Sequence, residues 1–363
     1  MSAPQPKPGI LEISPYVGGE SEIAGVSRVI KLASNEGALG PSPKAMQAYI
    51  EQAETLHRYP DGAASALRKG LAAAYGLDAE RIVCGAGSDE LLDMLARAYA
   101  GPGDEVMFTE HGFLMYPIAA KGVGATPVAV PEKNLYADVD ALLERAGPKT
   151  KILYLANPNN PTGTYLPDGE IRRLREGLPA HVLLVIDAAY AEYVTRNDYS
   201  AGGQLVDECD NVVMTRTFSK IYALGGLRLG WAYCPASVAD VLNRLRGPFN
   251  VATPALAAGL AALADVAFTD AVRAHTATWL DWTKGELTKL GIEVPSQVGN
   301  FVLARFPDNP EHDAEAADVF LKSRGIIVRR MAGYGLPDCL RITIGREDEM
   351  RPLIEALGEF MGQ

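Results

Sequence analysis

The sequence predicts an α/β fold, in which a mostly parallel sheet of seven strands lies between helices and a smaller α+β domain accompanies it. Three observations lead to this prediction. Short apolar runs recur between residues 81 and 234, amphipathic stretches separate several of them, and the pattern changes after Phe268. Alternating strands and helices are typical of parallel sheets, whose ligand sites lie at the carboxyl ends of the strands.

The expected strands are short runs rich in β-branched and other apolar residues, and they cover residues 81–84, 105–108, 126–130, 151–156, 182–187, 212–217 and 229–234. Amphipathic spacing predicts helices between several of them, at residues 88–100, 138–146 and 168–177. The run 182–186 is apolar without interruption. This is typical of a central strand that is covered on both faces.

The last third of the chain has a different order of elements. A long helical segment at 269–290 leads into the apolar runs 301–306, 326–330 and 340–345, and a C-terminal helix follows. This order suggests a separate α+β domain. We therefore expect an N-terminal segment, 1–39, that packs with the small domain, a large cofactor-binding domain, 40–268, and a small domain, 269–363.

Composition limits the partners and the compartment. The 363 residues are 48% hydrophobic, which suffices for one large core and a satellite domain. A net charge of -11 argues against nucleic acid or an anionic membrane as a partner, although local arginines can still bind a small anion. Four scattered cysteines, a polar start and no apolar stretch of membrane-spanning length predict a cytoplasmic protein. The five histidines show no metal-ligand spacing, so we expect no metal site.

Lys220 is the leading candidate for catalysis. It ends the sequence Thr-Arg-Thr-Phe-Ser-Lys, and Arg228 follows within a glycine-flanked segment. A lysine amine can form a Schiff base with an aldehyde cofactor, while Ser219 and Arg228 hold a phosphate on the same cofactor. Because most lysines are solvated surface groups, this interpretation depends on the motifs upstream.

The segment Gly85–Glu90 (Gly-Ala-Gly-Ser-Asp-Glu) follows a strand and opens a helix. Glycines allow close approach to an anion, and the N–H groups of a helix start attract one. Glu90 stands where a dinucleotide fingerprint needs its third glycine, so that fingerprint fails. Ser88 as an ordinary helix N-cap explains the segment equally well when it is considered alone. A phosphate-binding cup gains support from Ser219 and Arg228.

Polar residues also follow two central strands. Residues 157–163 contain more turn formers than a simple reversal needs, and we expect Asn160 to point its amide at a ligand oxygen, although a plain turn is the alternative. Asp187 ends the apolar run 182–186. A carboxylate there needs a cation, and a protonated pyridine nitrogen suits it, with a helix N-cap as the alternative. Tyr190 would then present its hydroxyl to the ring's phenolic oxygen.

Three further residues have the right chemistry for a site. Phe113 stands shortly after the strand 105–108 and either stacks on a cofactor ring or belongs to the core. Arg329 follows an apolar run, and Arg341 alternates with apolar neighbours. Guanidinium groups can fork onto a carboxylate or a phosphate. We expect Arg330, in contrast, to face solvent.

Together, Asn160, Asp187, Tyr190, the pair Ser219-Lys220 and Arg228 resemble the fold-type-I, pyridoxal-phosphate-dependent aminotransferases of classes I and II. The resemblance extends over nearly the whole chain. Four more segments are similar to the histidinol-phosphate aminotransferase family within that group, namely Ile13–Tyr16, Lys31–Glu36, His57–Asp61 and Met331–Pro337.

The resemblance implies a role for each site residue. Lys220 would form the Schiff base with pyridoxal 5'-phosphate, Asp187 would pair with the pyridine nitrogen, Asn160 and Tyr190 would contact the ring oxygen, and Phe113 would stack on the ring. The phosphate would lie against Ser88, Asp89, Ser219 and Arg228. Substrate would contact Tyr16, Asn35, Arg329 and Arg341. Tyr59 would reach the cofactor and substrate of a neighbouring subunit, which implies an obligate homodimer with shared active sites.

The implied reaction is ping-pong transamination between histidinol phosphate and 2-oxoglutarate in histidine biosynthesis, with Lys220 as the base. One alternative is an aromatic aminotransferase acting on tyrosine or phenylalanine, and another is a phosphothreonine decarboxylase. A nicotinamide-dependent dehydrogenase and a non-catalytic binding protein are disfavoured. The sequence departs from the family pattern at Phe113, Ala188, Gly37-Ala38 and Arg330. The departures at Gly37, Ala38 and Arg330 bear on substrate choice more than on chemistry.

Overall fold

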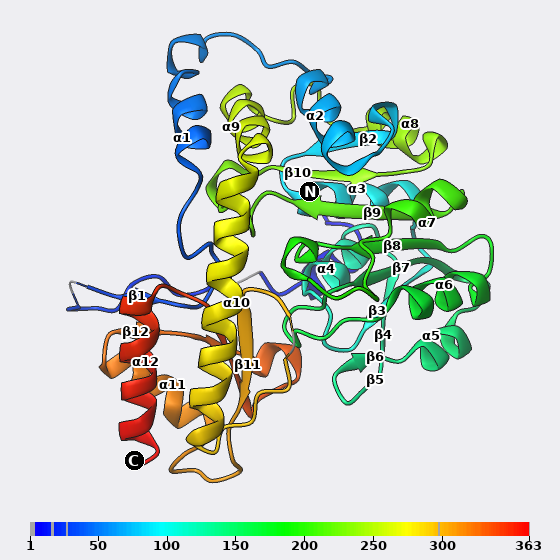
Figure 1. Ribbon diagram of the computed structural model, residues 1–363. Coiled ribbons are helices and arrows are strands. Elements are labelled where there is room, and N and C mark those ends of the chain that lie inside the picture. Colours follow the sequence, from blue (N-terminus) through cyan, green and yellow to red (C-terminus); the bar gives the residue numbers. More distant parts are fainter. Residues whose placement is uncertain (1–3, 16–17, 27, 297, 363) are drawn as a thin grey trace.

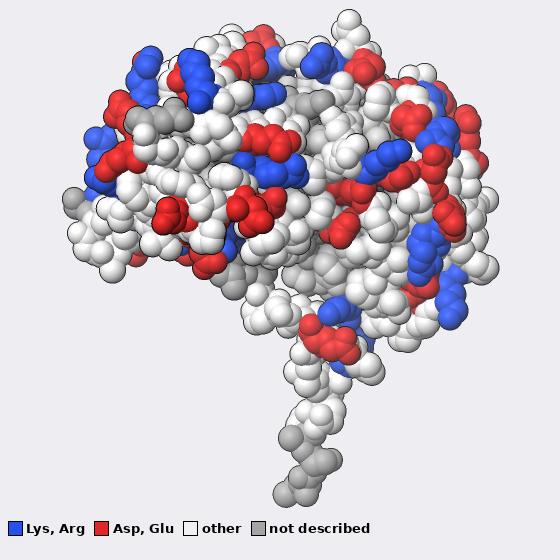
Figure 2. Space-filling view, turned by 90° about the horizontal axis from the view of Figure 1, so that it is seen from below, with Lys and Arg blue, Asp and Glu red and all other residues white. Residues whose placement is uncertain are grey.

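The computed structural model describes residues 4–15, 18–26, 28–296 and 298–362. A large α/β body lies beside a smaller sheet with its own helices, and the long helix α10 (Val266–Lys289) runs along both (Figure 1). On the face drawn in Figure 2, lysines and arginines are interspersed with acidic residues, and no large area carries a single sign of charge.

The large sheet has seven strands in the order β2-β10-β9-β8-β7-β3-β4. Their bounds are β2 (Ile82–Gly85), β3 (Glu105–Thr109), β4 (Thr126–Val130), β7 (Thr150–Ala156), β8 (Leu183–Asp187), β9 (Val212–Thr217) and β10 (Gly230–Tyr233). Only β10 runs antiparallel to its neighbours. The predicted α/β class with a mostly parallel sheet is confirmed.

Helices cover both faces of this sheet (Figure 1). The helices before α10 are α1 (Pro43–Ile50), α2 (Ser65–Tyr75), α3 (Ser88–Tyr99), α4 (Met115–Gly122), α5 (Val139–Arg145), α6 (Asp168–Gly177), α7 (Gly203–Glu208), α8 (Ala236–Leu245) and α9 (Thr253–Ala264), and α1 lies against α9. Alternate residues of one strand enter different cores, as Leu184 and Ile186 join one hydrophobic cluster while Leu183 and Val185 join the other. The strands therefore read as continuous apolar runs because both faces are buried.

The smaller sheet is antiparallel, with the order β11-β14-β13. It comprises β11 (Phe301–Arg305), β13 (Arg329–Arg330) and β14 (Cys339–Thr343), and it packs with α10, α11 (Ala314–Ser323) and α12 (Glu347–Phe360). The predicted strand 326–330 is divided, because β12 (Ile326–Ile327) pairs instead with β1 (Ile30–Lys31) near the N-terminus. The predicted domains, 1–39, 40–268 and 269–363, stay a prediction. The predicted boundary between residues 268 and 269 lies inside α10.

The remaining elements are a short hairpin and several 3-10 helices. A hairpin of β5 (Glu132–Lys133) and β6 (Tyr136–Ala137) projects from the large body. The 3-10 helices are Ile10–Glu12, Ala53–Thr55, Ala79–Arg81, Ala191–Tyr193, Gly225–Leu227 and Ala332–Tyr334. Within the described ranges, no single helix has the length and hydropathy to cross a membrane; α9 and α10 meet these requirements only as a pair, which is bent by 76°.

Candidate active site

A cavity of about 310 Å³ lies between the carboxyl ends of the large sheet and the small sheet. It gathers the predicted site residues except two, and those that line it are Asn35, Ser88, Asp89, Phe113, Asn160, Asp187, Tyr190, Ser219, Lys220, Arg228, Arg329 and Arg341. Tyr16 lies outside the described residues. Tyr59 is described and lies elsewhere.

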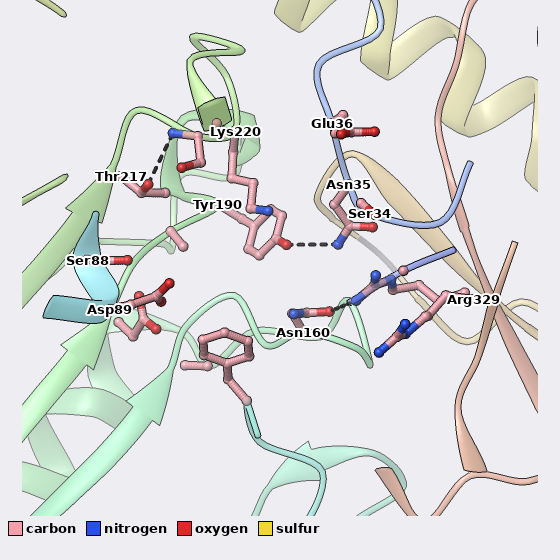
Figure 3. A pocket seen from close by; sticks show the side chains of 18 of the residues that line it. Ser34, Asn35, Glu36, Ser88, Asp89, Asn160, Tyr190, Thr217, Lys220 and Arg329 are labelled. Carbon is pink, nitrogen blue, oxygen red and sulfur yellow. Dashed lines mark hydrogen bonds between the residues drawn. The ribbon is translucent and has the colours of Figure 1, made fainter. Parts of the chain in front are cut away.

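The parallel strands explain why residues far apart in sequence meet here. Ala156 at the end of β7 pairs with Asp187 at the end of β8, and Asp187 pairs with Thr215 near the end of β9. The loops after these strands therefore leave the same edge of the sheet. They carry Asn160, Tyr190 and Lys220 into one cavity (Figure 3).

Asp187 is buried, with only 5% of its surface exposed. Its carboxylate accepts hydrogen bonds from the Tyr116 hydroxyl at 2.9 Å and the Thr215 hydroxyl at 3.2 Å. Burial raises the pKa of Asp187 to about 6, although these hydrogen bonds oppose the shift. Among the described residues the carboxylate has neutral donors and no ion pair, so a cationic ring nitrogen at this position fits the site.

Tyr116 supports Asp187 from behind the cavity and was not predicted from the sequence. It stands one turn after Phe113 and stacks on Tyr154 with ring centroids 4.9 Å apart. Its ring also meets the edge of Phe113 at 5.9 Å. The available signal was a second aromatic residue three positions after Phe113, and the turn before α4 brings the two together through a hydrogen bond from the Tyr116 N–H to the Phe113 carbonyl at 3.0 Å. Phe113 therefore lines the cavity and also contacts the core.

Lys220 extends its amine into the cavity beside Tyr190 (Figure 3). The Nζ atom lies 5.6 Å from the centroid of the Tyr190 ring. Among the described residues no carboxylate lies within ion-pair distance of this amine. An amine without a carboxylate partner in such a cavity is suited to covalent bonding with an aldehyde.

Asn35 joins three parts of the molecule at the opposite wall of the cavity. Its Nδ2 donates to the Tyr190 hydroxyl at 2.8 Å, and its backbone N–H donates to the Thr343 hydroxyl of β14 at 2.8 Å. Asn300, just before β11, donates to the Asn35 carbonyl at 3.1 Å. Asn35 has a φ of 54°, which holds the chain in this turn. Its amide thus contacts a residue that we assign to the cofactor ring.

The phosphate cup is formed by Ser88 and Asp89 at the start of α3 and by Ser219 and Arg228 opposite them. Arg228 Nη2 lies 3.2 Å from an Asp89 carboxylate oxygen, and its Nη1 lies 3.4 Å from Ser219 Oγ. The N-cap of α3 is Gly87, so the alternative of Ser88 as N-cap is wrong.

Two glycines give the cup its shape. A Cβ on Gly87 would lie 2.6 Å from Arg228 Nη2, and a Cβ on Gly230 would lie 2.3 Å from Ser88 N. Such distances are shorter than van der Waals contact, so a side chain at Gly230 would displace the backbone at the start of α3. The cup thus combines the N–H groups of a helix start, which have no partner inside the helix, with a guanidinium, a combination that binds phosphate well.

The arginines of the small sheet reach the cavity from the other side. Arg341 is buried and donates to Asn160 Oδ1 at 2.6 Å and to the Ala33 carbonyl at 2.8 Å. Arg329 donates to the Gly18 carbonyl at 2.7 Å. Arg330 forms an ion pair with Glu315 at 2.9 Å and does not line the cavity. The alternation of side chains along these strands explains the difference.

Tyr59 is 82% exposed and lies away from the cavity of its own chain. Its ring stacks on Phe249, with centroids 4.8 Å apart and an angle of 19° between planes. Its predicted role concerns a second subunit and stays a prediction.

Comparison with known proteins agrees with this arrangement. The family model for aminotransferase class I and II matches residues 27–357. A histidinol-phosphate aminotransferase of Paramagnetospirillum magneticum is 64% identical over 100% of both chains, and that of Rhodospirillum rubrum is 62% identical over 99% of this chain and 97% of its own. A crystal structure of histidinol-phosphate aminotransferase from Sinorhizobium meliloti in complex with pyridoxal-5'-phosphate has a TM-score of 0.89, at 29% identity over 99% of each chain.

Proposed function

Because the chain belongs to the class I and II aminotransferases, and within them to the histidinol-phosphate aminotransferase family, we propose that it transfers an amino group between histidinol phosphate and 2-oxoglutarate. The products are imidazole-acetol phosphate and glutamate, and the reaction is reversible. The observation that carries the proposal is a single cavity in which a lysine amine, a buried carboxylate, a phosphate cup and two arginines face one another.

The residues present fit pyridoxal 5'-phosphate. Ser88, Asp89, Ser219 and Arg228 would hold its phosphate, and Asp187 would hold its ring nitrogen in the charged form. When bound, pyridoxal phosphate supplies an aldehyde for the amino group and a cationic ring that stabilises negative charge at the substrate Cα. The fit rests on the buried Asp187, which has only neutral donors among the described residues, and on the glycine-lined cup.

Each remaining residue acts on the substrate or on the position of the ring. Lys220 would accept the proton from the substrate Cα and return it, because its amine is the basic group in the cavity without a carboxylate partner. Tyr190 and Asn160 would hydrogen-bond the ring oxygen and so fix the plane of the ring, while Phe113 would cover one face of it.

The two arginines must accept two kinds of anion. Histidinol phosphate brings a phosphate and no carboxylate, whereas 2-oxoglutarate brings two carboxylates. A guanidinium group binds both, since its N–H groups match two oxygens of either anion. Arg341 is already oriented by Asn160 and Ala33, so it loses little side-chain freedom on binding.

The substrate assignment predicts strong dependence on the substrate phosphate. We expect kcat/KM for histidinol phosphate to exceed that for histidinol, phenylalanine and tyrosine, and Arg341→Lys to lower it about 10- to 100-fold because the bidentate contact is lost. Arg330→Lys is the matched control, since Arg330 pairs with Glu315 outside the cavity. Steady-state kinetics on this panel measures both effects. Equal use of phenylalanine or tyrosine would favour the aromatic aminotransferase instead.

We further propose a cytoplasmic homodimer in which Tyr59 reaches the partner's cavity. In support, the stretch of chain that leads to Tyr59 exposes the large apolar side chains of Met46, Tyr49, Ile50 and Leu56, and Phe249, which stacks on Tyr59, is exposed as well. Exposed apolar side chains that form a patch are typical of an interaction surface. Sedimentation equilibrium should give twice the mass of the 38.8 kDa chain at micromolar concentration.

Tyr59→Ala should weaken cofactor binding without changing the cavity of its own chain. A monomer with full activity would contradict the proposal. The four free cysteines suit a reducing compartment.

A further inference from the structure

Two side chains outside the cavity, those of Glu90 and Asn250, form hydrogen bonds with the backbone next to the phosphate cup. Glu90 Oε2 accepts a hydrogen bond from the Ala86 N–H at 2.6 Å and another from Asn250 Nδ2 at 2.7 Å. The same Asn250 Nδ2 donates to the Cys84 carbonyl at 3.2 Å. We call Gly85–Gly87 the cup loop, and Glu90 with Asn250 the clamp. The clamp therefore binds the cup loop and the strand end before it.

The position of Glu90 on α3 differs from the usual capping arrangement. A glutamate at the third helical position normally accepts from the N–H of the N-cap residue. Here the N-cap is Gly87, whose N–H donates to the Gly85 carbonyl at 2.8 Å, and Glu90 accepts from Ala86 one residue earlier. The first N–H groups of a helix have no partner inside it. The N–H groups of Ser88 and Asp89 thus have no partner inside α3, and both residues line the cavity, as their side chains show in Figure 3.

Space around the cup loop is too small for another arrangement. Gly87 has a φ of 84°. A Cβ on Gly85 would lie 2.8 Å from Leu91 Cγ and 3.2 Å from Glu90 Oε2. A carboxylate with two N–H donors forms charge-assisted hydrogen bonds, which are stronger than neutral ones. The clamp thereby selects one backbone path for the cup loop.

Asn250 is itself held in place from the other side. Arg246 Nη1 lies 3.4 Å from Asn250 Oδ1, which orients the side-chain amide so that its nitrogen faces Glu90. The preceding residue, Phe249, has a φ of 63°, and its ring stacks on Tyr59. The segment between α8 and α9 thus contacts both the cup loop and the tyrosine assigned to the partner's cavity.

The charge of Glu90 has no direct use in binding a phosphate, because a second negative group would repel it. Neither Glu90 nor Asn250 lines the cavity, whereas Ser88 and Asp89 do. The hydrogen bonds of the two clamp residues therefore act on the phosphate site through the backbone of Cys84 and Ala86.

We propose that Glu90 and Asn250 are positioning residues for the cofactor phosphate. They hold the cup loop so that the N–H groups of Ser88 and Asp89 converge on one phosphate oxygen site. The inference rests on the cofactor assignment made under Proposed function. It concerns the phosphate alone, so loss of the clamp weakens binding of pyridoxal phosphate and leaves binding of pyridoxal, which has no phosphate, almost unchanged.

The test compares the two ligands on the same cofactor-free protein by absorbance titration. Glu90→Ala and Asn250→Ala should each weaken pyridoxal phosphate about tenfold, as expected for a charge-assisted hydrogen bond, and weaken pyridoxal less than about twofold. Glu90→Gln keeps an oxygen acceptor and should stay within about threefold of wild type. Asn250→Asp should bind more weakly than Asn250→Ala, because two carboxylates would then face each other. Asn197→Ala, at an exposed position of the large body outside the cavity, is the matched control.

Several outcomes would overturn the proposal. Equal loss for both ligands would show a general structural effect, and unchanged affinity in both alanine variants would show that the clamp has no role. Thermal unfolding of the cofactor-free protein shows whether each alanine variant folds. If one does not, the affinities of Glu90→Gln and Asn250→Asp for pyridoxal phosphate decide. Binding by Glu90→Gln that is weaker than, or equal to, binding by Asn250→Asp would contradict the clamp. If wild type binds no pyridoxal phosphate, the cofactor assignment itself fails.

Discussion

Replacing Lys220 with alanine is expected to lower kcat for transamination at least about a thousandfold, which is in the range found for loss of a catalytic acid–base group. The variant should also lose the visible absorbance of the holoenzyme, because that absorbance depends on the bond between the cofactor and the lysine amine. The physical reason is the position of Nζ, which lies in the cavity near Tyr190 and has no carboxylate within ion-pair distance among the described residues. Steady-state kinetics and an absorbance spectrum measure the two effects.

Lys149→Ala provides the control for this prediction, since Lys149 is exposed on the large domain and lies away from the cavity. It should leave both the rate and the spectrum unchanged. Retention of turnover and colour by the Lys220 variant would contradict the assignment of the lysine. Added small amines that partly restore turnover would support it, because they would replace the missing base.

Replacing Asp187 with asparagine is expected to have opposite effects on catalysis and on stability. The rate should fall about 100- to 1000-fold, because a neutral amide no longer holds the ring nitrogen in its charged form. The cofactor-free protein, in contrast, should become more stable at pH 7. The reason is that the buried carboxylate is costly when it is ionised, whereas the amide has no charge and nearly the same shape.

The pH dependence follows from the pKa of Asp187, which burial raises from 3.8 to about 6. The folded state therefore binds the proton more tightly than the unfolded chain does. The protonated Asp187 therefore stabilises the folded state fully below about pH 4, and this stabilisation is lost as the pH rises through about 6. A pKa raised by about two units corresponds to about 3 kcal/mol of unfolding free energy at pH 7.

Urea unfolding of the cofactor-free proteins between pH 4 and pH 8 tests this prediction. Wild type and Asp187→Asn should have similar stability near pH 4, and the variant should exceed wild type above pH 6. Saturating pyridoxal phosphate should reverse the order at pH 7, because the ring cation offsets the cost of the carboxylate. Asp210→Asn, at an exposed position, is the control. A constant difference at all pH values would contradict the role of ionisation.

The large sheet was predictable because a strand buried on both faces leaves a continuous apolar run. Leu183–Asp187 shows this, as its residues alternate between two hydrophobic clusters. The direction of β10 was not predictable, because apolar periodicity is the same in parallel and antiparallel strands. The division of the predicted strand 326–330 was also hidden, since it depends on pairing of β12 with β1 across nearly the whole chain.

Much of the candidate site was predictable because its residues follow the ends of recognisable strands. Asn160, Asp187 and Lys220 each come after such an end, and the parallel sheet brings these ends together. Tyr116 and Asn250 were missed, since their contacts with Asp187 and Glu90 arise only in the folded chain. Tyr59 needs a second subunit, which one sequence does not place.

Asn35 has a consequence for any motion between the two sheets. Its backbone and carbonyl are hydrogen-bonded to Thr343 and Asn300 of the small sheet region, while its side chain is bonded to Tyr190 of the large body. A rigid-body displacement of the small sheet must therefore either carry Asn35 along or stretch its 2.8 Å bond to the Tyr190 hydroxyl. The position of the Tyr190 hydroxyl is therefore coupled, through Asn35, to the position of the sheet that carries Arg329 and Arg341. Asn35 and the hydrogen bond from Arg341 to Asn160 thus couple the wall that carries the arginines to the wall that carries the ring contacts.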